Sequence, residues 1–379
     1  MEQPQSVQVP DNMKPAVTVL VDTYNHERFI EEAIVSVLEQ DFPASEMEIL
    51  VVDDGSTDCT PEVVRKFEPS VRVIRKANGG QASAFNVGIP EAKGEFIAFL
   101  DGDDWWAKDK LSRVMHAFGQ DPTLGVVGHG IVLVYPDGSQ VREVLREGFR
   151  FQANTPDGAR LFRLRKNFLG TSRLVLRADL AQRIIPVPEE LRFQADEYLF
   201  TLASVLQPVA VLPEAMVFYR QHATNYYQLS QQNSAARAPQ KQIVLSHIAQ
   251  TLSDQLRRIT LNHEVYSILV DILWAEALQM RLMIEGGWPW RTVSAEWKIY
   301  EVMCPEASAA HRIFKIATLL PALLLPPRVF YRLKKRLAVS PVYTSARQKV
   351  LPYPVASHVE IKRSSVPDAR RPGAQISPQ

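Results

Sequence analysis

Three aspartates within four residues, Asp101, Asp103 and Asp104, are the most distinctive chemical feature of the sequence. They follow residues 96–100 (FIAFL), an apolar run typical of a buried strand. Carboxylates crowded at a strand end repel one another unless a cation or hydrogen-bond donors meet them. A divalent cation such as Mg²⁺ or Mn²⁺, which takes one or two carboxylates with phosphate oxygens and water, is one solution. A solvated turn is the other, because Asp and Gly are common turn residues.

Polar residues also follow three other apolar runs, at residues 17–21, 49–52 and 71–74. Those able to bind a ligand are Thr23, Tyr24, Asn25, Asp53, Asp54, Asn78 and Gly79. In an open α/β sheet, ligands bind at the carboxyl ends of the strands, so we expect these loops to meet in one site. Purely structural roles are the alternatives: a capped turn for Asp53 and Asp54, a half-buried aromatic for Tyr24, and a helix N-cap for Asn25.

The elements that must position these residues are strands that alternate with helices. The four apolar runs are separated by helical patterns, and continuous apolar strands of this kind indicate a parallel sheet covered on both faces. We predict an α/β fold with a doubly wound, mostly parallel sheet. Residues 1–14 are expected to be a flexible N-terminus, residues 231–340 a helical C-terminal region and residues 341–379, with six prolines, a disordered tail.

Composition excludes several classes of protein. In 379 residues, 43 basic and 42 acidic side chains leave a net charge of +1, so no nucleic-acid partner is expected. Two cysteines, Cys59 and Cys304, are too few for a disulfide framework or a cysteine zinc site. No apolar signal opens the chain, and residues 316–325 are too short for a membrane span. We expect a cytoplasmic protein, either free or peripheral on the inner face of the cell membrane.

Familiar phosphate-binding and hydrolytic motifs are missing from the sequence. There is no G-x-G-x-x-G after the first strand, no G-x-x-x-x-G-K-[ST], no G-x-S-x-G and no H-E-x-x-H. A phosphate ligand would therefore be held by a metal rather than by a glycine-rich loop.

Four segments together resemble the family 2 inverting glycosyltransferases, of the bacterial non-processive type, which have the GT-A fold. They are VTVLVDTYNHERFIEEAIVSVLEQ, ILVVDDGSTDCT, NGGQASAFNVGI and GEFIAFLDGDDWW. The order and spacing match over about residues 17–118, and more loosely over residues 126–225. The resemblance implies a GT-A domain over residues 15–230, with a nucleotide half (15–120) and an acceptor half (121–230).

The resemblance implies a role for each strand-end residue. Thr23, Tyr24 and Asn25 would line the nucleotide pocket with Asn78, Gly79 and Gly102, Asp53 would accept a hydrogen bond from the base, and Asp54 would support that loop. Asp101 and Asp103 would form the D-x-D pair, Asp101 toward the ribose and sugar and Asp103 on the metal. One position departs from the pattern: Phe85 stands where many relatives have an Arg that meets the diphosphate.

The catalytic base is expected further along the chain, in an acidic pair at a helix start. Asp196 and Glu197 fit that pattern, and Asp196 is the first choice; ordinary N-terminal helix charge is the alternative. Downstream, His222, grouped with Asn225 in a segment that resembles one of the family, is a candidate metal ligand. A surface histidine is the bland alternative for His222.

The inferred reaction moves a sugar from a nucleotide diphosphate sugar to a hydroxyl of a saccharide or lipid-linked acceptor, with Mn²⁺ or Mg²⁺ and with inversion. Such a reaction suits cell-surface polysaccharide or glycolipid synthesis. The alternative is a catalytically inactive nucleotide-sugar binding module that acts in an assembly. An oligomer is compatible with the sequence.

A basic amphipathic stretch over residues 313–337 carries five cations between Arg328 and Arg336. It predicts either contact with an anionic membrane surface or a packing helix with a solvated basic face.

Overall fold

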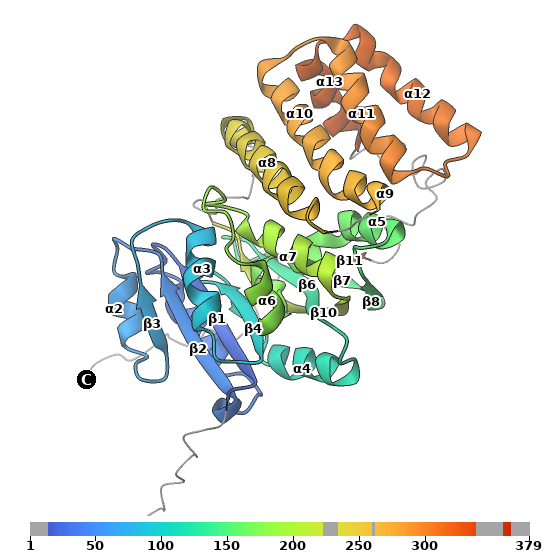
Figure 1. Cartoon of the computed structure of the whole chain (residues 1–379). Helices are drawn as coiled ribbons and strands as arrows, with labels where there is room; N and C mark the ends of the chain where they lie inside the picture. The colour runs from blue at the N-terminus through green and yellow to red at the C-terminus, as the bar shows by residue number, and fades with distance from the viewer. Residues whose placement is uncertain (1–13, 223–233, 260–261, 339–358, 365–379) are drawn as a thin grey trace, which may run out of the picture.

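A single mixed sheet organises the first part of the chain (Figure 1). The computed structural model describes residues 14–222, 234–259, 262–338 and 359–364. The sheet order is β11-β7-β6-β9-β4-β1-β2-β3, and β10 pairs with β5, β6 and β8. The strands are β1 (Val17–Thr23), β2 (Met47–Asp53), β3 (Arg72–Arg75), β4 (Phe96–Asp101), β5 (Trp105–Trp106), β6 (Val126–Val134), β7 (Gln140–Leu145), β8 (Phe149–Phe151), β9 (Val175–Arg177), β10 (Val209–Arg220) and β11 (Val359–Ser364).

The strands β3, β2, β1 and β4 run parallel to one another, as the apolar runs predict. Successive side chains of a strand point to opposite faces, so both faces must be covered. On β1, Val19 and Val21 join the core on one face, and Leu20 joins the core on the other. The predicted α/β architecture is therefore confirmed.

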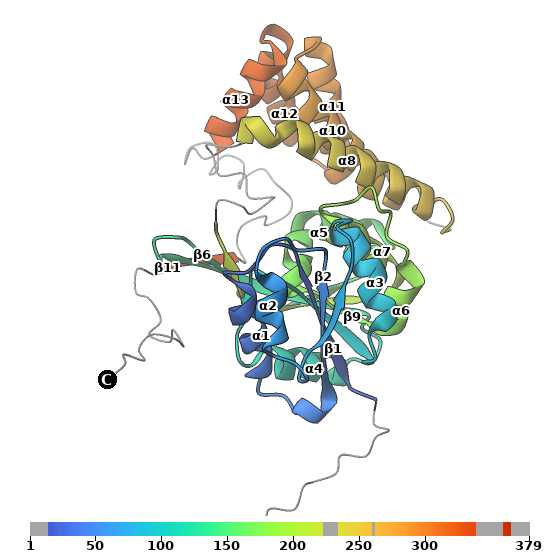
Figure 2. The same ribbon diagram turned by 90° about the vertical axis from the view of Figure 1, so that its left-hand side faces the viewer.

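Helices cover both faces of this sheet (Figure 2). One face carries α1 (Ile30–Leu38), α2 (Thr60–Arg65) and α4 (Lys110–Gln120). The other carries α3 (Gln81–Glu91), α5 (Pro156–Arg165), α6 (Ala178–Ile184) and α7 (Ala195–Leu206).

A helical C-terminal region follows, as predicted. Its helices are α8 (Ser234–Leu256), α9 (His263–Tyr266), α10 (Ile272–Glu285), α11 (Pro289–Met303), α12 (Ala309–Leu324) and α13 (Pro327–Ala338). Its α8 and α10 share the core of the sheet's second face, and Arg163 of α5 pairs with Glu276 of α10 at 2.6 Å. Among the residues that the structure describes, no helix has the length and apolar content to cross a bilayer.

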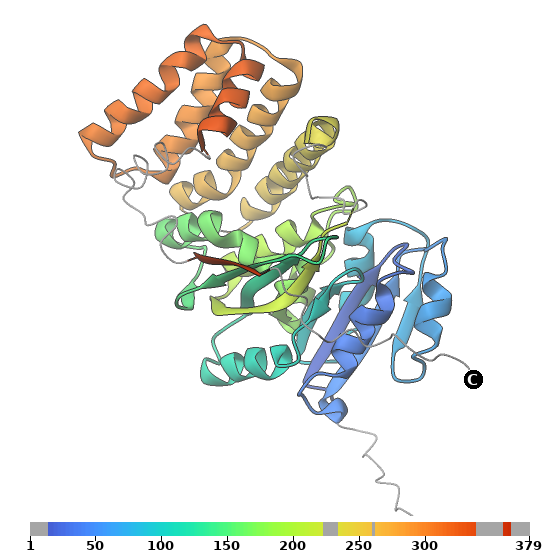
Figure 3. The same ribbon diagram turned by 180° about the vertical axis from the view of Figure 1, so that it is seen from behind.

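Two features differ from the expectations. Residues 359–364, predicted as tail, form β11, which lies antiparallel along β7 (Figure 3). The rest of the predicted tail, residues 1–13 and the predicted domain boundary at residue 230 lie outside the described residues. The first helix begins at Ile30, so Asn25 is not its N-cap. Instead, Asn25 has a φ of 56° and its side chain accepts a hydrogen bond from the backbone N–H of Thr57 at 2.8 Å.

Candidate active site

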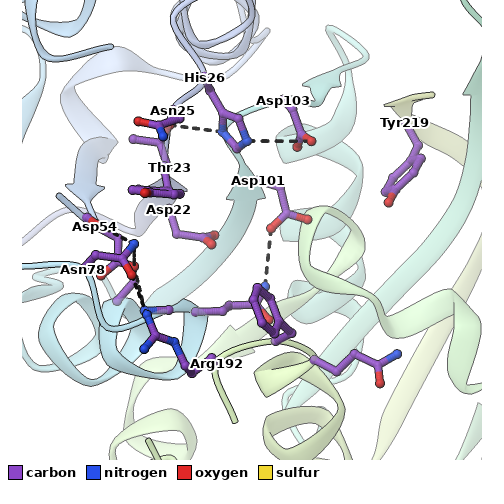
Figure 4. A pocket seen from close by; sticks show the side chains of 16 residues that line it. Asp22, Thr23, Asn25, His26, Asp54, Asn78, Asp101, Asp103, Arg192 and Tyr219 are labelled. Atoms are coloured by element: carbon purple, nitrogen blue, oxygen red, sulfur yellow. Dashed lines mark hydrogen bonds and ion pairs between the residues drawn. The ribbon is translucent and has the colours of Figure 1, made fainter. Parts of the chain in front are cut away.

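A cavity of about 550 Å³ lies at the carboxyl ends of β1, β2 and β4 (Figure 4). Most of the predicted strand-end residues meet there. Those that line it are Thr23, Tyr24, Asn25, Asp54, Asn78, Asp101 and Asp103. We call this space the donor-side cavity.

Carboxylates crowd the floor of the donor-side cavity because β1 and β4 are in register. Asp22 and Asp101 are direct partners across these parallel strands. Burial and the neighbouring Asp103 raise the pKa of Asp22 to about 8, and burial and Asp22 hold the pKa of Asp101 well above its ordinary value. Within the described chain, Oδ1 of Asp22 is buried with no hydrogen-bond partner. The floor therefore favours a cation or a hydrogen-bond donor.

Asp103 differs from these two carboxyl groups because histidines face it. Its Oδ2 lies 2.9 Å from Nε2 of His222 and 3.9 Å from Nε2 of His26. Burial opposes ionisation of Asp103, but the two histidines outweigh burial and its pKa is lowered. Asp103 is the member of this cluster most readily ionised.

Asp104, unlike the other two aspartates of the triplet, is not among the residues that line the cavity. It is buried, accepts a hydrogen bond from Oγ of Ser172 at 2.6 Å and accepts another from the backbone N–H of Arg220 at 3.1 Å. The Ser172 carbonyl in turn accepts from Nζ of buried Lys110 at 2.8 Å. Asp104 thus ties the end of β4 to β10, and the cluster splits into two carboxylates that line the cavity and one that does not.

The paired aspartates after β2 also have different surroundings. Asp53 is buried outside the cavity lining, where its Oδ1 accepts from the backbone N–H of Ser56 at 2.8 Å and Arg75 lies 3.4 Å from its Oδ2. The hydrogen bond from Ser56 forms the capped turn, which is one of the two roles that the sequence allows for Asp53.

Asp54 faces the donor-side cavity and organises the loop after β3. It accepts from Nζ of Lys76 at 2.6 Å and from the backbone N–H groups of Gly79 at 2.9 Å and Gly80 at 2.7 Å. Gly79 therefore acts through this bond and is not among the lining residues. Gly102 does not line the cavity either: a Cβ there would lie 2.6 Å from Oγ1 of Thr23, so glycine allows the close approach of two loops.

His222 is not among the lining residues, but it contacts Asp103 and packs on Phe29 with ring centroids 4.7 Å apart. Asn225, grouped with it in the sequence, lies outside the described residues.

A second cavity of about 370 Å³ adjoins the first and contains the predicted acidic pair. The two cavities share Gln81, Asp101, Gln194 and Tyr219 as lining residues. Asp196 lies in the first turn of α7, where its Oδ1 accepts from the N–H of Glu197 at 2.8 Å and its Oδ2 from the N–H of Thr171 at 3.2 Å. Burial and the neighbouring Glu197 raise the pKa of Asp196 to about 6.

Glu197 is placed differently from its neighbour. It is buried, bonded to Lys166, and 4.0 Å from Arg163. Its charge is therefore balanced by cations of the protein, whereas Asp196 accepts hydrogen bonds from Thr171 and from the backbone of Glu197. Both residues line the second cavity, as Asp101 does.

Several lining residues were not predicted, among them His26, Gln81, Arg192 and Tyr219. Gln81 bridges the cavities, donating to Oγ1 of Thr171 at 3.0 Å and accepting from the N–H of Ala195 at 3.0 Å. Arg192 donates to Oδ1 of Asn78 at 2.5 Å. Phe85 is fully buried, so α3 supplies no cation at that position. Arg192 lines the cavity instead, and its carbonyl accepts from the N–H of Gln81 at the start of α3 at 3.0 Å.

Comparison with known proteins identifies relatives of this chain. The model of the family described as glycosyl transferase family 2 matches residues 18–178. An uncharacterised glycosyltransferase of Nostoc is 30% identical over 251 residues, covering 64% of this chain and 76% of that protein. The poly(ribitol-phosphate) beta-N-acetylglucosaminyltransferase TarS of Staphylococcus aureus is 31% identical over 208 residues, which is 53% of this chain and 35% of TarS.

A solved structure shows the same fold over a longer stretch. The mannosyltransferase PcManGT of Pyrobaculum calidifontis, in complex with GDP-Man and Mn²⁺, superimposes with a TM-score of 0.50 at 21% identity and covers 91% of this chain and 86% of its own.

Proposed function

The chain belongs to glycosyl transferase family 2 and is a glycosyltransferase, and on this premise we propose that it transfers a sugar from a nucleotide diphosphate sugar to an acceptor hydroxyl with inversion. The observation that carries the proposal is the junction of the two cavities: a carboxylate-rich space for a charged donor opens beside Asp196, with Asp101 between them.

The donor is proposed to bind in the donor-side cavity. Thr23, Tyr24, Asn25 and Asn78 would surround the nucleoside, and the exposed ring of Tyr24 offers a stacking surface. Asp54 would keep the Asn78 loop in place, and Asp53 would act through its turn unless the base reaches it. Arg192, together with Lys76, supplies positive charge near the mouth.

The floor of this cavity fits a divalent cation. No three His, Cys, Asp or Glu side chains of the described residues form a complete ligand set, so the ligand's own oxygens would have to complete the coordination. Among the described residues, Oδ1 of Asp22 has no hydrogen-bond partner, and the pKa of Asp101 is raised. Buried carboxylates have these two properties when no cation lies beside them. Asp103 would hold Mn²⁺ or Mg²⁺ together with one of the other two candidates, Asp101 or His222. When bound, the ion would offset charge on the departing diphosphate. The GDP-Man and Mn²⁺ complex of PcManGT supports this class of donor and metal.

Asp196 is proposed as the general base. Its carboxylate would take the proton of the acceptor hydroxyl as the oxygen attacks the anomeric carbon and the bond to the diphosphate breaks. A pKa near 6 keeps it ionised at neutral pH while retaining more basicity than an ordinary aspartate. Lys166 holds Glu197 in a separate ion pair, and this supports Asp196 over Glu197 for the role.

The acceptor is proposed to be a saccharide or lipid-linked hydroxyl in cell-surface polysaccharide or glycolipid synthesis, on the inner face of the cell membrane. TarS, a poly(ribitol-phosphate) N-acetylglucosaminyltransferase, supports this class of pathway. An assembly role without catalysis is the second candidate, and turnover separates it from the first.

The experiment is a screen of UDP- and GDP-sugars by thermal shift with Mn²⁺, followed by release of UDP or GDP from the donor that stabilises the protein. We expect slow hydrolysis without acceptor, faster release with it, and loss of both in excess EDTA. Binding without any turnover of the donor in the presence of membrane extract would favour the non-catalytic candidate.

A further inference from the structure

The last two helices of the C-terminal region carry charge of one sign. Together α12 and α13 contain seven Lys or Arg residues and no Asp or Glu. Two of these cations are used internally, because Lys315 and Lys334 both pair with Glu296 of α11. The exposed arginines of this pair are Arg312, Arg328, Arg332 and Arg336.

The helix α12 packs mainly on α11, α13 packs mainly on α10, and the two helices also contact each other. Leu319 of α12 and Phe330 and Tyr331 of α13 form a small core with Leu282 of α10. In Figures 1 and 2, α12 and α13 lie at the end of the molecule farthest from the sheet. Their remaining sides face away from α10 and α11.

The outward side of α12 is apolar. Side chains spaced three or four residues apart are exposed there: Ile313, Ile316, Leu320, Leu323 and Leu324. Leu324 is 85% exposed and Ile313 is 66% exposed. Internal packing already uses the opposite side of this helix, so a continuous exposed apolar stripe indicates an external partner.

The outward side of α13 alternates cations with aliphatic side chains. Arg328, Val329, Arg332, Leu333 and Arg336 follow one another at helical spacing, and all five are exposed. This pattern suits the boundary between lipid headgroups and acyl chains, where guanidinium groups meet phosphates and aliphatic groups enter the apolar layer.

Two exposed tryptophans adjoin these stripes. Trp288, the N-cap of α11, and Trp290, in the first turn of that helix, are 73% and 61% exposed. Arg328 donates to the Ile284 carbonyl at the end of α10, which fastens α10 to the start of α13. Tryptophan is enriched at membrane–water interfaces because its ring is apolar and its N–H is polar.

We propose that this outer surface, formed by the outward sides of α12 and α13 with Trp288 and Trp290, docks the enzyme on an anionic lipid bilayer. Charge decides between lipid and a second copy of the chain: two copies meeting through this surface would bring arginines of the same sign together, whereas anionic headgroups neutralise them. The proposal concerns attachment alone and is independent of the sugar transferred.

The test is co-sedimentation of the full chain with vesicles of phosphatidylcholine alone or with 30% phosphatidylglycerol, at low and high salt. Two double variants change the outer surface, Arg332→Gln with Arg336→Gln, and Leu320→Gln with Leu324→Gln. Matched controls change exposed residues of the same kinds elsewhere: Arg65→Gln with Arg183→Gln, and Leu38→Gln with Ile243→Gln. Thermal unfolding of every variant verifies that it is folded.

We expect binding to the anionic vesicles only, weakened by salt, and lowered about tenfold or more in partition coefficient by each outer double variant. Both control pairs should bind as the parent does. Equal binding by all folded variants, or no binding to anionic vesicles, would overturn the proposal. Absence of vesicle binding together with a concentration-dependent dimer that the Leu320 and Leu324 substitutions abolish would identify a second copy as the partner instead.

Discussion

Replacing Asp196 by Asn tests the proposed base with little change of shape. Asn keeps one oxygen that can accept one of the two backbone N–H groups now bonded to the carboxylate, but it cannot take a proton. General-base catalysis contributes about 10²–10⁴ in rate, so kcat should fall by that amount. Donor affinity should stay within about twofold, because Asp196 lies in the second cavity and not among the residues lining the donor-side cavity.

The pH dependence of the transfer rate is a second test of the proposed base. Only ionised Asp196 can act as base, and its pKa is about 6. The active fraction is then about 10% at pH 5, half at pH 6 and about 90% at pH 7, so kcat/KM should rise with pH and level off above neutrality. In the Asn variant this limb should vanish from the residual rate.

The contribution of Asp196 to folding stability should decrease as pH rises, whereas its contribution to activity increases. The pKa of Asp196 is raised from 3.8 to about 6 on folding, so its effect on the free energy of unfolding is most favourable below pH 3.8 and is lost as pH rises through 6. This loss in the free energy of unfolding is no more than about 3 kcal/mol, because Asp196 is only half-buried. The Asn variant also loses one backbone hydrogen bond, which contributes about 1 kcal/mol. The Asn variant should thus be as stable as the parent, or slightly more so, at pH 7.5, with any advantage gone at pH 4.

Initial rates from pH 5 to 8, with release of the nucleoside diphosphate as readout, and urea unfolding at both pH values measure these effects. Glu197→Gln is the contrasting variant: it leaves Lys166 unpaired and should lower stability. Because it also removes a negative charge that raises the pKa of Asp196, the pH midpoint of activity should move below that of the parent. Near-normal turnover of Asp196→Asn, or a pH midpoint below 5 in the parent, would refute the reasoning.

Three further predictions concern the donor side. Asp103→Asn should lower transfer at least 100-fold and weaken Mn²⁺-dependent donor binding in thermal-shift titrations; unchanged Mn²⁺ dependence would contradict the assignment. Arg192→Ala should raise the donor KM about tenfold with kcat nearly unchanged, and a lower kcat at an unchanged KM would exclude this role. Gly80→Ala should destabilise the fold by about 1–3 kcal/mol in urea unfolding, because Gly80 has a φ of 86° and a Cβ there would lie 2.7 Å from the Arg192 backbone; equal stability would show that this loop relaxes freely.

The parallel sheet could be predicted because its strands are buried on both faces and therefore appear as continuous apolar runs. The same runs locate the site, since ligand-binding loops follow the carboxyl ends of such strands. Thr23, Asp54, Asn78 and Asp101 line the cavity for this reason alone. Their chemical roles remain predictions.

The rest depended on contacts between residues far apart in the sequence. Asp104 is adjacent to Asp103, but its partner Ser172 is 68 positions away, and only the fold distinguishes a structural carboxylate from a ligand. Arg192 follows no strand and starts no helix, so no local pattern could place it over Asn78. Strand β11 pairs with β7 across more than two hundred residues, and its proline-rich surroundings favoured a tail.

The central claim is that the donor-side cavity binds a nucleotide diphosphate sugar together with a divalent cation beside Asp196. A crystal structure of the Asp196→Asn variant, soaked with Mn²⁺ and the donor found by screening, tests it most directly. We predict anomalous scattering from manganese at Asp103 and electron density for the nucleoside against Thr23 and Tyr24, with the anomeric carbon facing Asn at position 196. A donor bound elsewhere on the protein, or manganese bound away from Asp103, would contradict the claim.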